Sequence, residues 1–189
     1  KSVIFGDPKI EPAKKEQLIR AFARAIRNLV EYIPGPDMGT DERCMAWIKD
    51  EIGRAVGLPP EIGGIPLDEI GATGFGLKAS VEAALQYCDF ALQGARVVIQ
   101  GFGSVGKHAA RFLGGKGTVL VAACDSRGTI HNPKGIDVGR LSALKDSGKS
   151  VVDYPDGEKL DADAVIDVPC EIWIPAARPD VIRKDNVNR

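Results

Sequence analysis

The stretch "VVIQGFGSVGKHAARFL", residues 97–113, constrains the fold of this chain more than any other segment. A short apolar run leads into three glycines with 1-3-6 spacing, Gly101, Gly103 and Gly106, and then into a helical pattern. In a dinucleotide-binding βαβ unit the first glycine permits a tight turn, the second lets the backbone approach a pyrophosphate, and the third lets the helix pack on the strand. A tight strand-to-helix turn without a ligand is the alternative.

The rest of the C-terminal part alternates between strand and helix patterns. "ARVVIQ", "TVLVAAC" and "EIWIPAA" read as strands, and "SVGKHAARFLGG" and "DVGRLSALKDSG" read as helices. Such alternation predicts βαβ units and a parallel sheet. We therefore expect an α/β fold: a Rossmann-type, doubly wound parallel sheet in residues 73–189, preceded by part of a smaller α/β domain for substrate binding and oligomerisation in residues 1–72.

An acidic residue follows the second predicted strand at the distance that a dinucleotide site needs. Asp125 lies 19 residues past Gly106 and directly after "VLVAAC", where its carboxylate can accept hydrogen bonds from the adenosine ribose. An ordinary turn aspartate is the alternative. Asp125 would repel a 2′-phosphate and favour NAD, whereas Arg127 could pair with one, so NADP stays open. The predicted cofactor contacts also include Phe102, Ser104, Val105 and Ser126.

The N-terminal part predicts one strand followed by helices. "SVIF" (residues 2–5) reads as a strand closed by Gly6, Asp7 and Pro8. Helical spacing then predicts an amphipathic helix from Lys14 to Ile33. Its apolar stripe consists of Leu18, Phe22, Ile26, Leu29 and Ile33.

Two further helices are expected before the glycine turn. Thr40 is the predicted N-cap of the second helix, and Gly57 is its predicted end. A third helix runs from about Gly74 to Tyr87. Its predicted inward residues are Leu77, Val81 and Leu85.

Composition argues against several classes of protein. A net charge of −1 argues against nucleic acid or an anionic membrane as the main partner, and no apolar run approaches the ~18 residues that span a bilayer. The N-terminus does not read as a signal peptide. Four scattered cysteines without a CxxC pair, and only two histidines, predict no metal site and indicate reduced thiols in a cytoplasmic protein. The chain starts at Lys1 inside a predicted strand and stops at Arg189, so we expect a fragment.

Several motifs follow one another in a fixed order: "KSVIFGDP", "IPGPDMGT" with "MAWI", "ATGFG", "QGFGSVG", "CDSRGTIHNPKG" and "IWIPAARPDVI". In this order they resemble the Glu/Leu/Phe/Val dehydrogenase family, most closely its glutamate dehydrogenase branch, over essentially the whole chain. The resemblance implies reversible NAD(P)-dependent oxidative deamination of an L-amino acid to a 2-oxo acid and ammonia, with glutamate the favoured substrate. It also implies a homo-oligomer, a hexamer in that family.

The resemblance also implies roles for individual residues. Lys1 and Asp37 match the catalytic lysine and aspartate, and Thr73, Ala176 and Ala177 match segments beside the nicotinamide. A lysine that is crowded by other cations or partly desolvated has a lowered pKa and can act as a base near neutral pH. A neighbouring carboxylate can then move protons between the amine nitrogen and solvent.

Two features keep other readings open. The connector "GGIPLDEIGATG" is shorter than in the glutamate branch, and "KSVIFGDP" leans toward the leucine-type members. A leucine, valine or phenylalanine dehydrogenase of the same family is therefore one alternative. A non-catalytic, dinucleotide-binding regulatory protein is the alternative from another class, and the presence of Lys1 and Asp37 argues against it.

Overall fold

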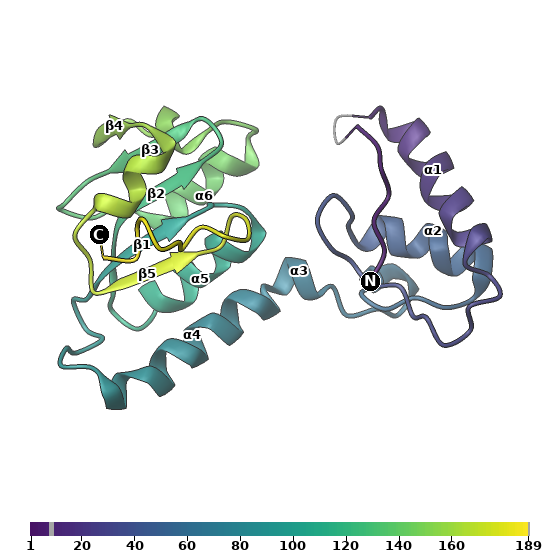
Figure 1. Ribbon diagram of the computed structural model, residues 1–189, viewed down its shortest axis with the longest axis horizontal. Helices are drawn as coiled ribbons and strands as arrows, with labels where there is room; N and C mark the ends of the chain where they lie inside the picture. Colours follow the sequence, from purple (N-terminus) through teal and green to yellow (C-terminus); the bar gives the residue numbers. More distant parts are fainter. Residues whose placement is uncertain (8–9, 189) are drawn as a thin grey trace. The chain divides into compact units, whose positions relative to one another are not determined.

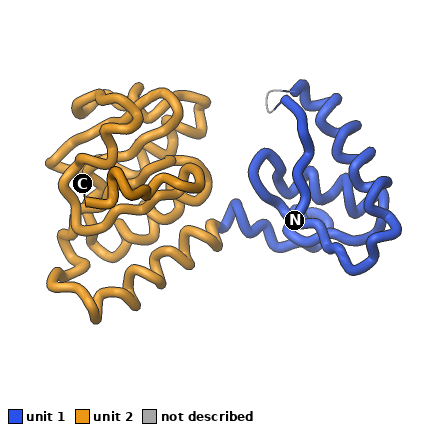
Figure 2. Tube along the Cα trace, viewed as in Figure 1, with its two compact units in different colours: residues 1–70 blue, residues 71–189 orange. Residues whose placement is uncertain are grey.

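A computed structural model describes residues 1–7 and 10–188. The chain forms two compact units, Lys1–Ile70 and Gly71–Arg189 (Figure 2). Pro8, at the end of the predicted first strand, and the terminal Arg189 lie outside the described residues.

Unit 1 is built on two packed helices (Figure 1). Its elements are α1 (Pro12–Ala25), α2 (Glu42–Ile52), the 3₁₀ helix η1 (Pro60–Ile62) and the short α3 (Leu67–Ile70). Proline is tolerated in the first turn of α1 because the N–H groups there have no partner within the helix. The core between α1 and α2 consists of Ile19, Ala23, Cys44, Met45 and Ile48.

Helix α1 is shorter than predicted because a side chain from beyond α2 binds the chain that follows it. The helix ends at Ala25, and two members of the predicted stripe, Leu29 and Ile33, are exposed. The guanidinium of Arg54 forms hydrogen bonds with the carbonyl groups of this irregular segment, in place of the bonds that a longer helix would make. It donates hydrogen bonds to the carbonyl oxygens of Ile26, Leu29 and Tyr32.

The predicted strand at residues 2–5 is wrong. Ile4 packs against the α1–α2 core, while Val3 and Phe5 are exposed. This alternation is that of a strand, but a strand needs a neighbour to pair its backbone groups. Residues 1–7 and 10–70 contain no second strand, so the described part of the smaller domain is helical rather than α/β.

Both predicted ends of α2 are also wrong. The N-cap is Asp41, whose carboxylate accepts the N–H of Cys44 at 2.9 Å. The helix ends at Gly53, which adopts a left-handed conformation (φ 77°) and donates its N–H to the carbonyl of Lys49. Gly53 is the earlier of two glycines able to end the helix, so Gly57 is left for another role.

Unit 2 carries the sheet. Its helices are α4 (Ala72–Ala84), η2 (Leu85–Tyr87), α5 (Ser104–Gly114), α6 (Val138–Asp146), η3 (Val151–Asp153) and η4 (Ala162–Asp167). Its strands are β1 (Arg96–Gln100), β2 (Val119–Asp125), β3 (Gly128–His131), β4 (Glu158–Leu160) and β5 (Ile172–Pro175). The strand order is β4-β3-β2-β1-β5, with β1 parallel to both β2 and β5.

The sheet confirms the predicted α/β class and adds two antiparallel strands. The three predicted strands are its parallel part, whereas β3 turns back directly from β2 and β4 pairs with β3. Side chains of α4, α5 and α6 pack on one face of this sheet, with Leu77 and Val81 of α4 facing inward as predicted.

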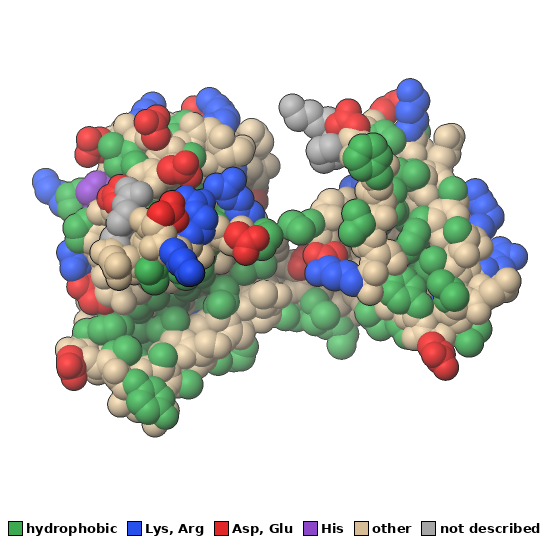
Figure 3. Space-filling view, viewed as in Figure 1, with side chains coloured by type: hydrophobic (Ala, Val, Ile, Leu, Met, Phe, Trp, Pro, Cys, Tyr) green, Lys and Arg blue, Asp and Glu red, His purple; other side chains and the backbone are tan. Residues whose placement is uncertain are grey.

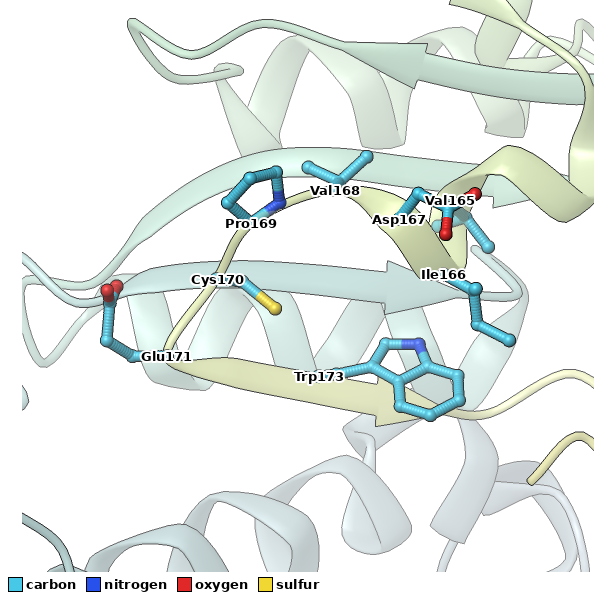
Figure 4. A pocket seen from close by; sticks show the side chains of 8 residues that line it. All are labelled: Val165, Ile166, Asp167, Val168, Pro169, Cys170, Glu171 and Trp173. Atoms are coloured by element: carbon cyan, nitrogen blue, oxygen red, sulfur yellow. The ribbon is translucent and has the colours of Figure 1, made fainter. Parts of the chain in front are cut away.

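The other face of the sheet packs against η4. Val98, Val121 and Val165 belong to this second core cluster. A cavity of about 390 Å³ lies between η4 and β5 and includes Trp173 in its lining (Figure 4). None of the predicted site residues lines this cavity.

The surface carries charges of both signs. In the face that Figure 3 shows, acidic and basic side chains are interspersed over both units. Within residues 1–7 and 10–188, no helix combines the length and the apolar character needed to cross a membrane.

Candidate functional site

Three predicted segments meet at one edge of the sheet. Because β1, β2 and β5 are parallel, their carboxyl ends lie together. The carbonyl of Cys124, in β2, accepts the N–H groups of Gly101 and Phe102 at 3.1 and 2.8 Å. Ala176, directly after β5, donates its N–H to the carbonyl of Gln100 in β1 at 2.8 Å. The glycine turn is thus fixed to both neighbouring strands.

Each glycine of the turn has a separate physical reason. Gly101 has φ +95°, and a Cβ there would lie 2.7 Å from Cα of Ala177. A Cβ on Gly106 would collide with the carbonyl oxygen of Gly101. Gly103, in contrast, has no atom within 4 Å of the place where a Cβ would stand. The first and third glycines serve close packing, and the second leaves open space where a ligand can approach the backbone.

This open space lies at the N-terminus of α5. Gly103 is the N-cap residue and supplies no side chain to cap the helix, while Ser104 and Val105 form the first turn. The positive end of a helix dipole and the N–H groups there favour a phosphate. The geometry therefore fits the pyrophosphate of a dinucleotide. The side chain of Phe102 is buried in the core, so only its backbone faces this site.

Thr73 is exposed in the first turn of α4, which packs closely on α5. A Cβ on the adjacent Gly74 would lie 2.6 Å from the backbone nitrogen of Ala109. A Cβ on Gly71 would collide with the ring of His108. His108 was not among the predicted site residues. It holds the turn that carries Thr73, and no spacing pattern in the sequence indicates this contact.

Asp125 lies at the predicted edge, but its carboxylate is already occupied. It accepts hydrogen bonds from the ammonium of Lys145 (2.7 Å), the hydroxyl of Ser150 (2.7 Å) and two backbone N–H groups, those of Arg127 (2.9 Å) and Val151 (3.0 Å). Partial burial by itself raises the pKa of Asp125, and these donors outweigh it, lowering the pKa to about 2. A ribose hydroxyl would have to compete with these four donors.

The two residues after Asp125 form the turn between β2 and β3. Ser126 and Arg127 are both exposed. The guanidinium of Arg127 pairs with Asp153 of η3, with Nη1 3.1 Å from Oδ2. A 2′-phosphate would have to take Arg127 from this partner.

In unit 1 the structure brings Lys1 and Asp37 together. Lys1 Nζ lies 2.9 Å from Oδ2 of Asp37, and the two side chains are 79% and 52% exposed. The N–H of Met38 donates to the other carboxylate oxygen, Oδ1, at 2.8 Å. This arrangement holds an ammonium against a carboxylate whose orientation is fixed by its own backbone.

The direction of the pKa shift of Lys1 differs from the prediction. The hydrogen bond and charge of Asp37 raise the pKa of Lys1, whereas a general base was expected to have a lowered one. Hydrogen bonds from Lys1 and from the N–H of Met38 lower the pKa of Asp37. Lys1 is exposed and next to an anion, so the small effect of desolvation, which lowers its pKa, is outweighed by the hydrogen bond and the charge of Asp37. In this arrangement the unprotonated partner is Asp37.

The four cysteines are not paired in disulfides. Cys44, Cys88, Cys124 and Cys170 are free thiols, and burial raises the pKa of Cys44, Cys124 and Cys170. In the part of the chain that the structure describes, no three His, Cys, Asp or Glu side chains group as metal ligands.

Comparison with known families accounts for nearly the whole chain. The family model for Glutamate/Leucine/Phenylalanine/Valine dehydrogenase matches residues 63–189, and that for the Glu/Leu/Phe/Val dehydrogenase dimerisation domain matches residues 1–54. This chain belongs to the Glu/Leu/Phe/Val dehydrogenase family. The resemblance seen in the motifs is thereby confirmed.

Curated members of this family match nearly the whole chain. A glutamate dehydrogenase of Aeropyrum pernix is 36% identical over 97% of this chain, and glutamate dehydrogenase A2 of Halobacterium salinarum is 38% identical over 99%. The NADP-specific glutamate dehydrogenase of Saccharolobus shibatae is 35% identical over 98%. The matches cover 47–48% of these relatives, so the chain spans about half their length.

Solved structures of family members share the fold. The hetero-hexameric glutamate dehydrogenase of Thermus thermophilus, in a leucine-bound form, superposes with a TM-score of 0.83 at 30% identity, over 97% of this chain and 46% of that one. Glutamate dehydrogenase of Plasmodium falciparum superposes with a TM-score of 0.80 at 21% identity, over 96% and 43%, which supports the fold alone.

Proposed function

We propose that the protein containing this chain catalyses the reversible, NAD(P)-dependent oxidative deamination of an L-amino acid, with glutamate as substrate and 2-oxoglutarate and ammonia as products. The observation that carries the proposal is the glycine turn: Gly103 leaves an open place on α5, in a chain of a dehydrogenase family. We assign dinucleotide binding to residues 73–189, and substrate binding and oligomerisation to residues 1–72.

The nucleotide would be held mainly by backbone. Gly101, Gly103 and Gly106 with the N–H groups of Ser104 and Val105 suit the pyrophosphate. Thr73, Ala176 and Ala177 would lie beside the nicotinamide, as the family resemblance implies. The bound nicotinamide supplies the acceptor for the hydride that leaves Cα of the amino acid.

Lys1 and Asp37 would handle the protons. After the hydride has left, water must add to Cα and ammonia must depart, so a proton has to leave the water and another has to reach the nitrogen. The Asp37 carboxylate, whose pKa is lowered by Lys1 and Met38, is ionised at neutral pH, so it can take the proton from the water and pass a proton to the departing nitrogen. The ammonium of Lys1, 2.9 Å away, stabilises negative charge that develops on the substrate oxygen.

We propose NAD as the cofactor, with NADP as the alternative. The carboxylate of Asp125 favours NAD, but its ion pair with Lys145 reduces the charge that a 2′-phosphate would meet. A relative whose name marks it as NADP-specific supports the alternative. If Asp125→Ser does not raise the use of NADP relative to NAD, Asp125 does not select the cofactor.

The substrate is tested on the full-length protein with a panel of amino acids and both cofactors. Glutamate should give the highest kcat/KM, because all the named relatives above are glutamate dehydrogenases. Preference for leucine, valine or phenylalanine would identify the protein as another dehydrogenase of the same family and overturn glutamate as the substrate. Nucleotide binding without turnover of any amino acid would favour the regulatory alternative.

The assignment of Asp37 has its own test. Asp37→Asn should lower kcat by about 10²–10⁴-fold, as expected for the loss of one acid-base group, and leave nucleotide affinity unchanged. Lys1→Ala should do at least as much harm, and the double variant should be little worse than either single one, because both groups serve one step. Near-normal turnover of Asp37→Asn would show that Asp37 is a structural turn residue.

We propose that the full-length protein is a homo-hexamer. Large apolar side chains of unit 1 are exposed, among them Val3, Phe5, Leu29, Val30 and Ile33, and residues 1–54 match a dimerisation-domain model. The Thermus thermophilus relative is a hetero-hexamer. We also propose that the protein is cytoplasmic, a location that the free thiols support.

A further inference from the structure

Asp37 begins a tight turn that is closed by Thr40. The backbone N–H of Thr40 donates to the carbonyl of Asp37 at 2.9 Å, and Gly39 takes a left-handed conformation (φ +81°) within the turn. The hydroxyl of Thr40 adds two more bonds. It accepts the N–H of Asp37 and donates to the carbonyl of Asp37, each at 2.9 Å.

This hydroxyl has a different task from the one that the sequence suggests. Thr40 precedes α2 and would ordinarily be read as its N-cap, but Asp41 caps the helix. The Thr40 side chain is therefore committed to both backbone groups of a single residue, Asp37. A hydroxyl can donate and accept at once, and a methyl group of the same size can do neither.

A second contact holds the chain just before Asp37. Gly57, with φ +64°, approaches so closely that a Cβ there would lie 2.5 Å from Cδ of Pro36. The N–H of Val56 donates to the carbonyl of Pro34 at 2.8 Å. The loop after α2 thus supports one side of Asp37, and Thr40 closes the other.

We propose that Thr40 is a positioning residue for Asp37: its hydroxyl fixes the backbone from which the carboxylate reaches Lys1. The inference rests on the proposed function, since it matters for catalysis only if Asp37 moves protons. Without the hydroxyl the turn keeps one of its three hydrogen bonds, and the carboxylate loses its fixed direction. Misplacement of a catalytic group by about 1 Å can cost 10²-fold in rate.

The test compares Thr40→Val, Thr40→Ala and Thr40→Ser in the full-length enzyme. Thr40→Val and Thr40→Ala should lower kcat about 10-fold or more with KM for the nucleotide unchanged, and Thr40→Ser should stay within about threefold of the parent. The acid limb of the pH profile of kcat/KM should move to higher pH in Thr40→Val, because a loosened carboxylate is less well stabilised by Lys1 and Met38. Thr118→Val, the same change in unit 2, is the control and should leave kcat unaltered.

The dependence on Asp37 separates this inference from the proposed function. In an Asp37→Asn background, Thr40→Val should lower kcat less than twofold further, since the group that it positions is gone. The same fold-loss in both backgrounds, no loss in either Thr40→Val or Thr40→Ala, or no rescue by serine would each overturn the role of Thr40. Near-normal turnover of Asp37→Asn alone would instead overturn the catalytic assignment of Asp37. Should Thr40→Val fail to fold, Thr40→Ala and Thr40→Ser still decide the question.

Discussion

Replacing Asp125 by asparagine should destabilise unit 2 whether or not a nucleotide is bound. The carboxylate is 13% exposed and receives hydrogen bonds from Lys145, Ser150 and two backbone N–H groups. Its pKa falls from the ordinary 3.8 to about 2, which corresponds to roughly 2 kcal/mol in favour of the folded state at neutral pH. Asparagine also turns an N–H₂ group toward donors and leaves Lys145 without its anion, so we expect a loss of about 2–4 kcal/mol.

The pH dependence carries the diagnostic sign. The lowered pKa means that Asp125 contributes its stability fully above pH 3.8 and loses it as the pH falls through about 2. The difference in stability between the parent and Asp125→Asn should therefore shrink in that window. Urea unfolding across pH measures the difference, and hydrogen exchange of segments 119–131 and 138–153 locates it.

The matched control is Asp146→Asn. Asp146 pairs with Lys107, but its side chain is 62% exposed, so its loss should cost less than about 0.5 kcal/mol. If Asp125→Asn costs no more than this control, or if its deficit persists unchanged at pH 2, the hydrogen bonds to Asp125 do not stabilise the sheet as argued.

Three further predictions concern other parts of the chain. Gly106→Ala should destabilise unit 2 because a Cβ would strike the Gly101 carbonyl, whereas Gly103→Ala should fold normally and weaken nucleotide binding. Thermal unfolding measures the stability and calorimetry measures the nucleotide affinity. The reverse order of the two variants would contradict the roles assigned to the two glycines. Arg96 lowers the pKa of Glu171 to about 2, so the ion pair stabilises the fold above pH 4.5; Glu171→Gln should flatten the loss of stability between pH 4.5 and about 2, and an unchanged acid titration would count against it. The full-length protein should be a homo-oligomer, and a monomer by light scattering at micromolar concentration would remove that proposal.

The sequence predicts the elements of unit 2 well and those of unit 1 less well. The patterns around β1, α5, β2, α6 and β5 are local, since side-chain periodicity within ten or so residues distinguishes strand from helix, and all five elements are present. The short strands β3 and β4 have too few residues to show a period and depend on pairing with β2 and with each other. In unit 1, the end of α1 depends on Arg54, more than twenty residues further along the chain.

What the sequence alone determines here is where close backbone contacts occur and which family the motifs resemble. Gly101 and Gly106 mark such contacts because no other residue fits them. Only the tertiary structure decides which groups a side chain meets. In the folded chain the carboxylate of Asp125 accepts hydrogen bonds from Lys145 and Ser150. The hydroxyl of Thr40 binds the backbone of Asp37 and does not cap a helix. The physical reason is that hydrogen bonds and charges act over a few ångströms in space, and folding sets those distances between residues whose separation along the chain carries no such information.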